Sequence, residues 1–178
     1  MAAFSGTASN IRLDVCQVSI GGTDIGFTEG GVDIGIDCQQ IVITSDQYGA
    51  TPLNTKNTGS VVTVKFVLKE TSYANLAKCL YESTLRTTGG SAVGVGGLLA
   101  GAVDGLTVAV ALLLHPVDIA NGTLTNDVNV WKAVPRPGWK TKLGPNKETL
   151  FEVEFLALRD SSKTAGKQLI DLGATAAT

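Results

Sequence analysis

Residues 21–37, GGTDIGFTEGGVDIGID, decide how the first part of the chain folds. Six of these 17 residues are glycine, in two adjacent pairs and two single positions. Such a segment either turns a chain between strands or presents backbone N–H groups to a phosphate at the start of a helix. The glycines do not follow the GxGxxG spacing, and the run after them alternates as a strand does. We therefore predict a hairpin here and no nucleotide site.

The strand that follows is predicted from period-two alternation. Its polar side carries Asp33 and Asp37. At Gln39–Gln40 the phase slips, because apolar residues then fall on the other positions, and this predicts a β-bulge. The apolar side consists of Val32, Ile34, Ile36 and Cys38.

The next segment, residues 45–59 (SDQYGATPLNTKNTG), is polar and rich in turn-forming residues, so we expect a long loop. Residues 60–69 alternate again, with Lys65 and Lys69 on the polar side. Ser72 can cap a helix over residues 73–81, where apolar residues recur at helical spacing. Further strands are predicted at 11–20, 106–114, 127–134, 148–159 and 167–173.

This pattern predicts a mainly β protein of about seven strands and one helix. We expect a single domain over residues 1–178, an antiparallel β-sandwich or partly open barrel with one flanking α-helix. An N-terminal arm (1–9), the long loop, a Gly-rich segment (84–105) and a C-terminal segment (160–178) would extend from it. The apolar run at 92–114 is interrupted by five glycines and Asp104, so we expect no membrane span, and the N-terminus does not look like a secretion signal.

Composition favours a protein that assembles with other subunits. Only 17% of residues are charged, well below the usual quarter, while 44% are hydrophobic. A net charge of −2 argues against a protein that wraps nucleic acid with basic groups. Such a chain often buries apolar surface against partner subunits.

Candidates for chemistry are few. The three cysteines are widely spaced and odd in number, which predicts buried thiols in a reducing compartment rather than a disulfide framework or a metal pair. The single histidine, His115, stands at a strand end and cannot build a multi-histidine metal site. Trp131 and Trp139 fit either core and rim positions or a sugar-stacking pair. We expect no enzyme activity, cofactor or metal.

The order of these segments resembles the major tail tube proteins of long-tailed bacteriophages. The features that carry the resemblance are the 21–37 hairpin, the loop with Gly49, the strand-to-helix unit VVTVKFVLKETSYANLAKCL, and WKAVPRPGWKTK followed by ETLFEVEFLALRD. The resemblance implies a β-sandwich-like barrel whose six-membered rings stack into a hollow tube that conducts genome DNA. Related tubes occur in contractile tails and type VI secretion. The implied partners are copies of the chain itself, a tape-measure protein and tail terminator or baseplate proteins, in a virion assembled in the bacterial cytoplasm.

The resemblance also gives roles to particular residues. The acidic side chains Asp33, Asp37, Glu152 and Glu154 would line the lumen and repel DNA without binding it. The 45–59 loop would reach the neighbouring ring through Gln47, Tyr48, Pro52, Asn54 and Lys56. The Gly-rich segment would lie on the tube exterior or at a subunit contact. Two other interpretations remain: a head–tail joining or baseplate ring protein of the same fold, and a carbohydrate- or partner-binding β-sandwich that uses the two tryptophans.

Overall fold

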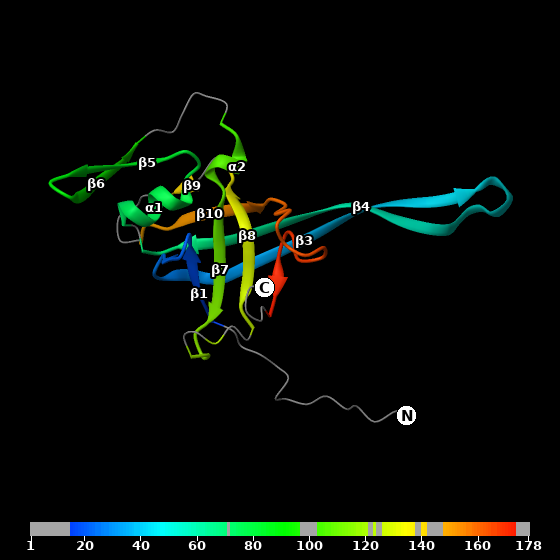
Figure 1. Ribbon diagram of the computed structural model, residues 1–178, viewed down its shortest axis with the longest axis horizontal. Coiled ribbons are helices and arrows are strands. Elements are labelled where there is room, and N and C mark those ends of the chain that lie inside the picture. Colours follow the sequence, from blue (N-terminus) through cyan, green and yellow to red (C-terminus); the bar gives the residue numbers. More distant parts are fainter. Residues whose placement is uncertain are drawn as a thin grey trace.

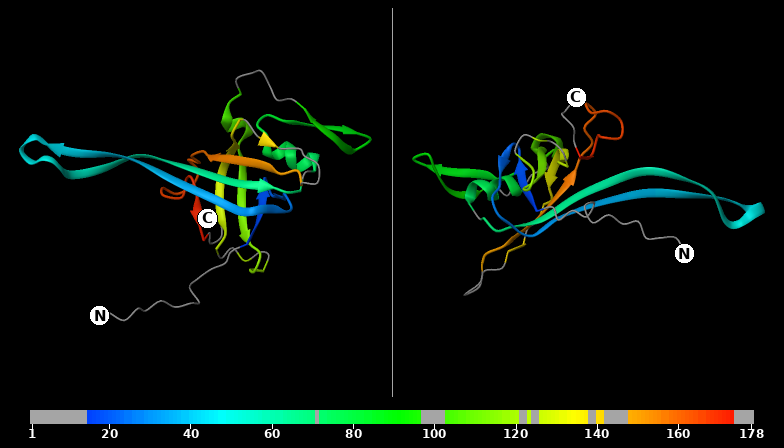
Figure 2. Two further views of the ribbon diagram at one scale, coloured as in Figure 1. Left: turned by 180° about the vertical axis from the view of Figure 1, so that it is seen from behind. Right: turned by 90° about the horizontal axis from the view of Figure 1, so that it is seen from below.

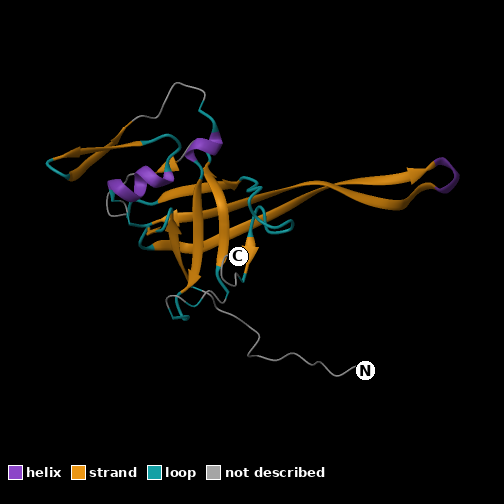
Figure 3. Ribbon diagram, viewed as in Figure 1, coloured by secondary structure: helices purple, strands orange, loops and turns teal. Residues whose placement is uncertain are grey.

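The computed structural model describes residues 15–70, 72–96, 103–120, 123, 126–137, 140–141 and 148–173. The predicted N-terminal arm and Trp139 lie outside these residues, as do parts of the Gly-rich and C-terminal segments. In the described part the protein is mainly β, with two short helices (Figures 1 and 3). Neither of these helices is long and apolar enough to cross a membrane.

One antiparallel sheet dominates the described residues. Its main path runs in the order β2-β1-β7-β8-β10-β4-β3, while β11 pairs with β8 and β9 with β10. The two ends of this path do not pair with each other, so the sheet curls without closing, as the prediction of a sandwich or partly open barrel allowed. The strand bounds are β1 (Cys16–Ile20), β2 (Thr23–Asp24), β3 (Thr28–Ser45), β4 (Gly49–Leu68), β7 (Val110–Pro116), β8 (Val128–Pro135), β9 (Lys140–Thr141), β10 (Phe151–Ala157) and β11 (Asp171–Leu172).

The core lies on the apolar side of this sheet. On β4 the even positions from 62 to 68 are buried, and on β10 the odd positions from 151 to 157 are buried, as period two requires. Phe66 and Phe155 stack at its centre, with ring centroids 5.9 Å apart. Val18, Ile20, Leu112, Leu114 and Val130 complete the core from β1, β7 and β8.

The predicted helix is confirmed as α1 (Tyr73–Cys79). The hydroxyl oxygen of Ser72 accepts a hydrogen bond from the backbone N–H of Asn75, the N-cap contact that the sequence predicts. The Asn75 side-chain amide donates to the carbonyl of Ile25 (2.8 Å), which joins the helix to the glycine-rich hairpin. A second, shorter helix, α2 (Gly105–Val108), occupies the start of the predicted 106–114 strand, so β7 begins only at Val110.

The first part of the Gly-rich segment forms a separate hairpin rather than a loop. Strands β5 (Thr84–Thr88) and β6 (Ser91–Gly96) pair with each other alone, and Gly89 and Gly90 turn the chain with φ of 58° and 83°. The Arg86 side chain lies so close to Gly94 that a Cβ there would sit 2.9 Å from its guanidinium. Gly94 therefore leaves room for the Arg86 side chain, while Gly89 and Gly90 turn the chain.

The largest difference from the prediction concerns residues 45–59, which do not form a loop. They form the end of a long hairpin: a 3₁₀ turn (η2, Asp46–Tyr48) and the first part of β4, which pairs with β3 through Ile41↔Lys56 and Ile43↔Asn54. The turn-forming residues occupy a local irregularity, because the paired register jumps from Ile43↔Asn54 to Ser45↔Gly49 and Pro52 falls inside that jump. Proline has no N–H to donate, so it is tolerated where the ladder is interrupted.

The predicted bulge at Gln39–Gln40 is confirmed, with one change. The extra residue lies in β4, since the partner of β3 shifts from Gly59 to Asn57 and skips Thr58. The Thr58 hydroxyl donates to the carbonyl of Gln39 (3.1 Å). Because β3 has no inserted residue between Asp33 and Ile43, Ile41 and Ile43 follow the side that carries Asp33 and Asp37.

Candidate functional site

The end of the β3–β4 hairpin, residues 39–59, is named the arm. Figures 1 and 2 show it projecting away from the other strands of the sheet. Apart from Ser45, every residue of the arm is exposed. All five residues of the predicted contact loop are among them: Gln47, Tyr48, Pro52, Asn54 and Lys56.

The arm exposes apolar side chains that would not stabilise a hairpin surrounded only by water. Ile41 is 57% exposed, Tyr48 66% and Leu53 51%, and Val42 and Ile43 are also exposed. By alternation along β3, Val42 lies on one side of the ribbon and Ile41 and Ile43 on the other. Two-stranded hairpins are marginally stable alone in water, and exposed apolar surface on them favours contact with another chain. The arm therefore has the properties of a docking element.

The free edge of β3 adds a second means of contact. β3 is the last strand of the sheet, and along its 18 residues only β4 pairs with it in the described part of the chain. Its outer edge thus presents N–H and C=O groups that can pair with a strand of another molecule. The Gly30–Gly31 irregularity, where the register shifts between Glu29 and Val32, interrupts this edge near the body.

The polar side of the sheet carries the predicted acidic residues. Asp33, Glu152 and Glu154 line one shallow groove over β3, β4 and β10, together with Lys65 and Pro137. Asp37 lies on the same side, four residues further along β3, where it pairs across with Val61. The structure thus gathers three of the four predicted residues and places the fourth toward the arm.

Basic residues stand between these carboxylates. Lys65 is the cross-strand partner of both Asp33 and Glu154, and its Nζ lies 3.3 Å from a Glu154 carboxylate oxygen. The other Glu154 oxygen lies 3.0 Å from the guanidinium of Arg136. Asp33, Lys65, Glu154 and Arg136 therefore form a row of alternating charge across the sheet.

A third basic residue, Lys69, lies at the body end of the same face. Its ammonium lies 2.8 Å from Glu148 and 3.0 Å from Glu29, and these bonds, first to Glu148 and then to Glu29, raise its pKa. Among described side chains the face and its border thus hold six carboxylates and three cations, an excess of three negative charges. The carboxylates are Glu29, Asp33, Asp37, Glu148, Glu152 and Glu154. Period-two alternation predicted the acidic residues. The positions of the cations between them depend on which residues of neighbouring strands pair.

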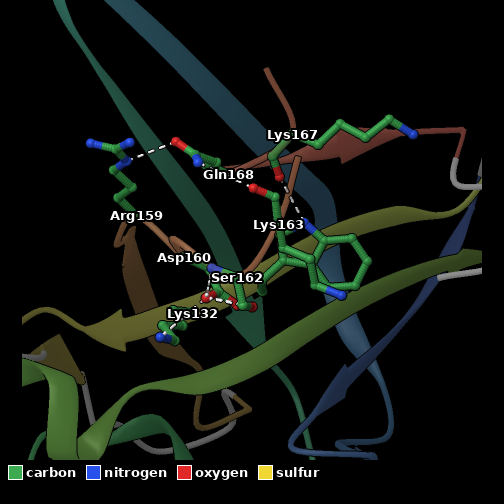
Figure 4. A network of polar contacts seen from close by, with 8 residues as sticks. Lys132, Arg159, Asp160, Ser162, Lys163, Lys167 and Gln168 are labelled. Carbon is green, nitrogen blue, oxygen red and sulfur yellow. Dashed lines mark hydrogen bonds and ion pairs between the residues drawn. The ribbon is translucent and has the colours of Figure 1, made fainter. Parts of the chain in front are cut away.

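Trp131 serves the attachment of the C-terminal segment. Its indole N–H donates to the carbonyl of Lys167 (2.8 Å), and the Lys163 ammonium lies 4.0 Å from the ring centroid (Figure 4). Beside it the Asp160 carboxylate accepts bonds from the Ser162 N–H and hydroxyl and lies 3.3 Å from Lys132. These contacts, the Ser162 N–H above all, lower the pKa of Asp160. One ring face of Trp131 is thus covered by Lys163, which disfavours a sugar-stacking role.

Trp131→Phe is expected to loosen this segment. Phenylalanine keeps a ring for Lys163 but loses the donor to Lys167, and one such hydrogen bond contributes about 1 kcal/mol to the free energy of unfolding. Limited proteolysis should then cut residues 160–170 faster than in the parent protein, while cleavage of the β5–β6 turn stays unchanged. Equal rates in segment 160–170 would contradict this role of the indole.

The cysteines differ from one another in the structure. Cys79 is buried as expected, and burial raises the pKa of its thiol to about 12, which keeps it protonated and unreactive. Cys38 is exposed beside the arm, so the prediction that all three thiols are buried is wrong for this one; its sulfur lies 3.5 Å from the Ser60 hydroxyl. Alternation placed Cys38 on the apolar side, but that side has no covering layer so close to the arm.

The arm and the polar face, taken together, form the candidate site. Within the described residues no cluster of three or more His, Cys, Asp or Glu side chains could hold a metal ion. No protein-family model matches the chain, and no curated protein sequence matches it.

Proposed function

We propose that this protein is a structural subunit of a phage tail tube, which assembles into hexameric rings that stack around a channel for DNA. The observation that carries the proposal is the arm. It exposes apolar side chains on both sides, and none of the described residues of its own subunit covers them. At about 3.3 Å per residue, the six steps along β3 from Gln39 to Ser45 extend it about 20 Å beyond the sheet. That reach suits a contact with the next subunit in a stack.

The direction of this contact supports an open assembly. The arm leaves one end of the sheet, while the β5–β6 hairpin and α1 lie at the other end (Figure 1). A contact between unlike surfaces is head-to-tail, and it either closes into a ring or continues as a filament. Rings joined by arms that all point the same way would form a tube.

The polar face supports the conduit role of this assembly. A face with three excess negative charges repels the phosphate backbone, while its internal ion pairs leave few free cations to bind it. We place this face toward the lumen in the proposed tube. DNA would then slide past it without a specific site.

Neutralising the four predicted acids tests this placement. With asparagine or glutamine at these positions, the face would carry one net positive charge, and assembled tubes should retain duplex DNA in a salt-dependent way. The substitutions are Asp33→Asn, Asp37→Asn, Glu152→Gln and Glu154→Gln. Filter retention of labelled DNA on purified tubes, with varied salt, measures the effect.

A control variant removes the same number of charges elsewhere and should leave DNA retention at the parent level. It carries Asp24→Asn, Glu70→Gln, Asp104→Asn and Asp118→Asn, at positions outside both the polar face and the arm. Equal DNA retention by the two variants would show that only the net charge of the subunit matters. It would contradict the placement of the polar face in the lumen.

Sedimentation over a concentration series tests the assembly itself. A tube subunit should give species that grow in size with concentration, because an open stack has no final size. A plateau at one ring would instead indicate the head–tail joining or baseplate protein of the same fold. A single subunit at all concentrations would favour a binding module and oppose the proposal.

A further inference from the structure

A buried polar pair, His115 and Asp127, lies outside both surfaces described above. His115 is the penultimate residue of β7, and Asp127 directly precedes β8. The imidazole Nδ1 lies 2.7 Å from an Asp127 carboxylate oxygen, and Nε2 lies 3.1 Å from the carbonyl oxygen of Ile119. Asp127 is 1% exposed and His115 9%. His115 is also the only histidine of the chain.

Both ring nitrogens of His115 thus face hydrogen-bond acceptors. A neutral imidazole carries one N–H, so it can donate to Asp127 or to Ile119 but not to both. Only the doubly protonated ring satisfies both contacts as the structure places them. The bond to Asp127 is the main cause that raises the pKa of His115; the Ile119 carbonyl adds to it, while burial acts in the opposite direction.

The charges around the ring also favour its cationic form. Asp118, on the turn after β7, adds a second negative charge. On β1, the cross-strand partner of His115 is Gln17, which is uncharged and donates a hydrogen bond to Asp24 of β2. The thiol of Cys16 precedes Gln17 in the sequence. On β11, the carboxylate of Asp171 forms an ion pair with Lys167 at 3.2 Å.

The pair connects three parts of the chain. Through Ile119 the ring holds the turn of residues 116–120 against the start of β8. On that turn the Val117 N–H donates to the carbonyl of Val15 (2.8 Å), where the described chain begins. The Asp127 carbonyl accepts from the N–H of Gly173 (2.8 Å), where it ends. The second carboxylate oxygen of Asp127 has no hydrogen-bond partner among the described atoms. If the ring lost its proton, this buried carboxylate would also lose the cation beside it.

We propose that protonated His115 is a pH-responsive latch that holds the 116–120 turn on Asp127 and thereby fixes the chain segments at Val15 and Gly173. Because the folded protein binds this proton more tightly than an unfolded chain, the latch is closed at low pH and opens as pH rises through the folded-state pKa. The proposal depends on this junction alone and not on tube assembly.

Nuclear magnetic resonance of the full chain tests the latch. The ¹⁵N shifts of the two ring nitrogens report protonation, and hydrogen-exchange protection factors of the Val117 and Gly173 amides report closure. We expect both nitrogens to be protonated at about pH 6 and to titrate above the ordinary histidine value of about 6.5. Protection at both amides should fall roughly tenfold or more over the same range, while that of Phe155 stays constant. A neutral ring at about pH 6, or amide protection that does not change as the ring titrates, would overturn the proposal.

Two variants separate the latch from general effects of pH. His115→Gln should remove the pH step in protection, and Glu70→Gln, a control at an exposed carboxyl outside this junction, should keep it. Asp127→Asn retains the side chain's size and should move the ring titration to lower pH, which provides a second reading if His115→Gln does not fold. An unchanged titration midpoint in Asp127→Asn would show that the pair is not coupled.

Discussion

Phe155→Ala is expected to lower the free energy of unfolding by about 3–5 kcal/mol, because it opens a cavity in the centre of the core. Phe155 is 0% exposed and stacks on Phe66, and its strand β10 joins β4 to β8. Loss of this ring therefore weakens packing in the middle of the sheet. Chemical denaturation, followed by tryptophan fluorescence, measures the change.

Phe27→Ala is the matched control for this substitution. Phe27 is 76% exposed, and replacement at such a position usually changes the free energy of unfolding by less than about 0.5 kcal/mol. Both variants should be compared in a background that does not assemble, since association adds apparent stability. Similar costs for the two substitutions would mean that the core is not where the structure places it.

Removal of the arm is expected to abolish assembly while the sheet stays folded. Gln39 and Gly59 are cross-strand partners, so an Asn-Gly turn between them can close the shortened hairpin in place of residues 40–58. Deletion of 45–59 alone would be harder to interpret, because it would leave the end of β3 without its paired strand. Sedimentation should show one subunit at every concentration, and circular dichroism should keep the β spectrum.

A subtler variant keeps the length of the arm. Threonine at Ile41, Val42 and Leu53 preserves strand preference and removes apolar surface, so the concentration needed for assembly should rise roughly tenfold or more. The control places threonine at three apolar residues of similar exposure outside the arm, Leu106, Val117 and Leu172, and should assemble as the parent does. If the shortened protein still forms tubes, the arm is not the stacking element.

Local patterns in the sequence predicted much of the sheet. Alternation identified the core sides of β4 and β10, and helical spacing after Ser72 identified α1 with its cap. On β3 the predicted apolar side is mostly exposed, and of its residues only Val32 packs against the core. The confirmed features depend on residues near one another in the chain. The same is true of the glycine-rich hairpin, where Gly21 and Gly22 turn the chain with φ of 56° and 75°.

The arm could not be predicted in this way. Pro52, Asn54 and Gly59 are turn formers, yet the segment is a strand because β3 pairs with it. That partner lies earlier in the chain and its pairing depends on register, which no local pattern records. The cations of the polar face were missed for a related reason. Lys65 was assigned to the polar side of its own strand, but its place between Asp33 and Glu154 follows only from the pairing of three strands.

Electron microscopy of the purified protein at high concentration shows whether it forms a tube. We expect open-ended tubes of stacked six-membered rings, with the arm of each subunit lying on the next ring and the β3–β4–β10 polar face lining the channel. Particles the size of one subunit at every concentration would contradict this expectation.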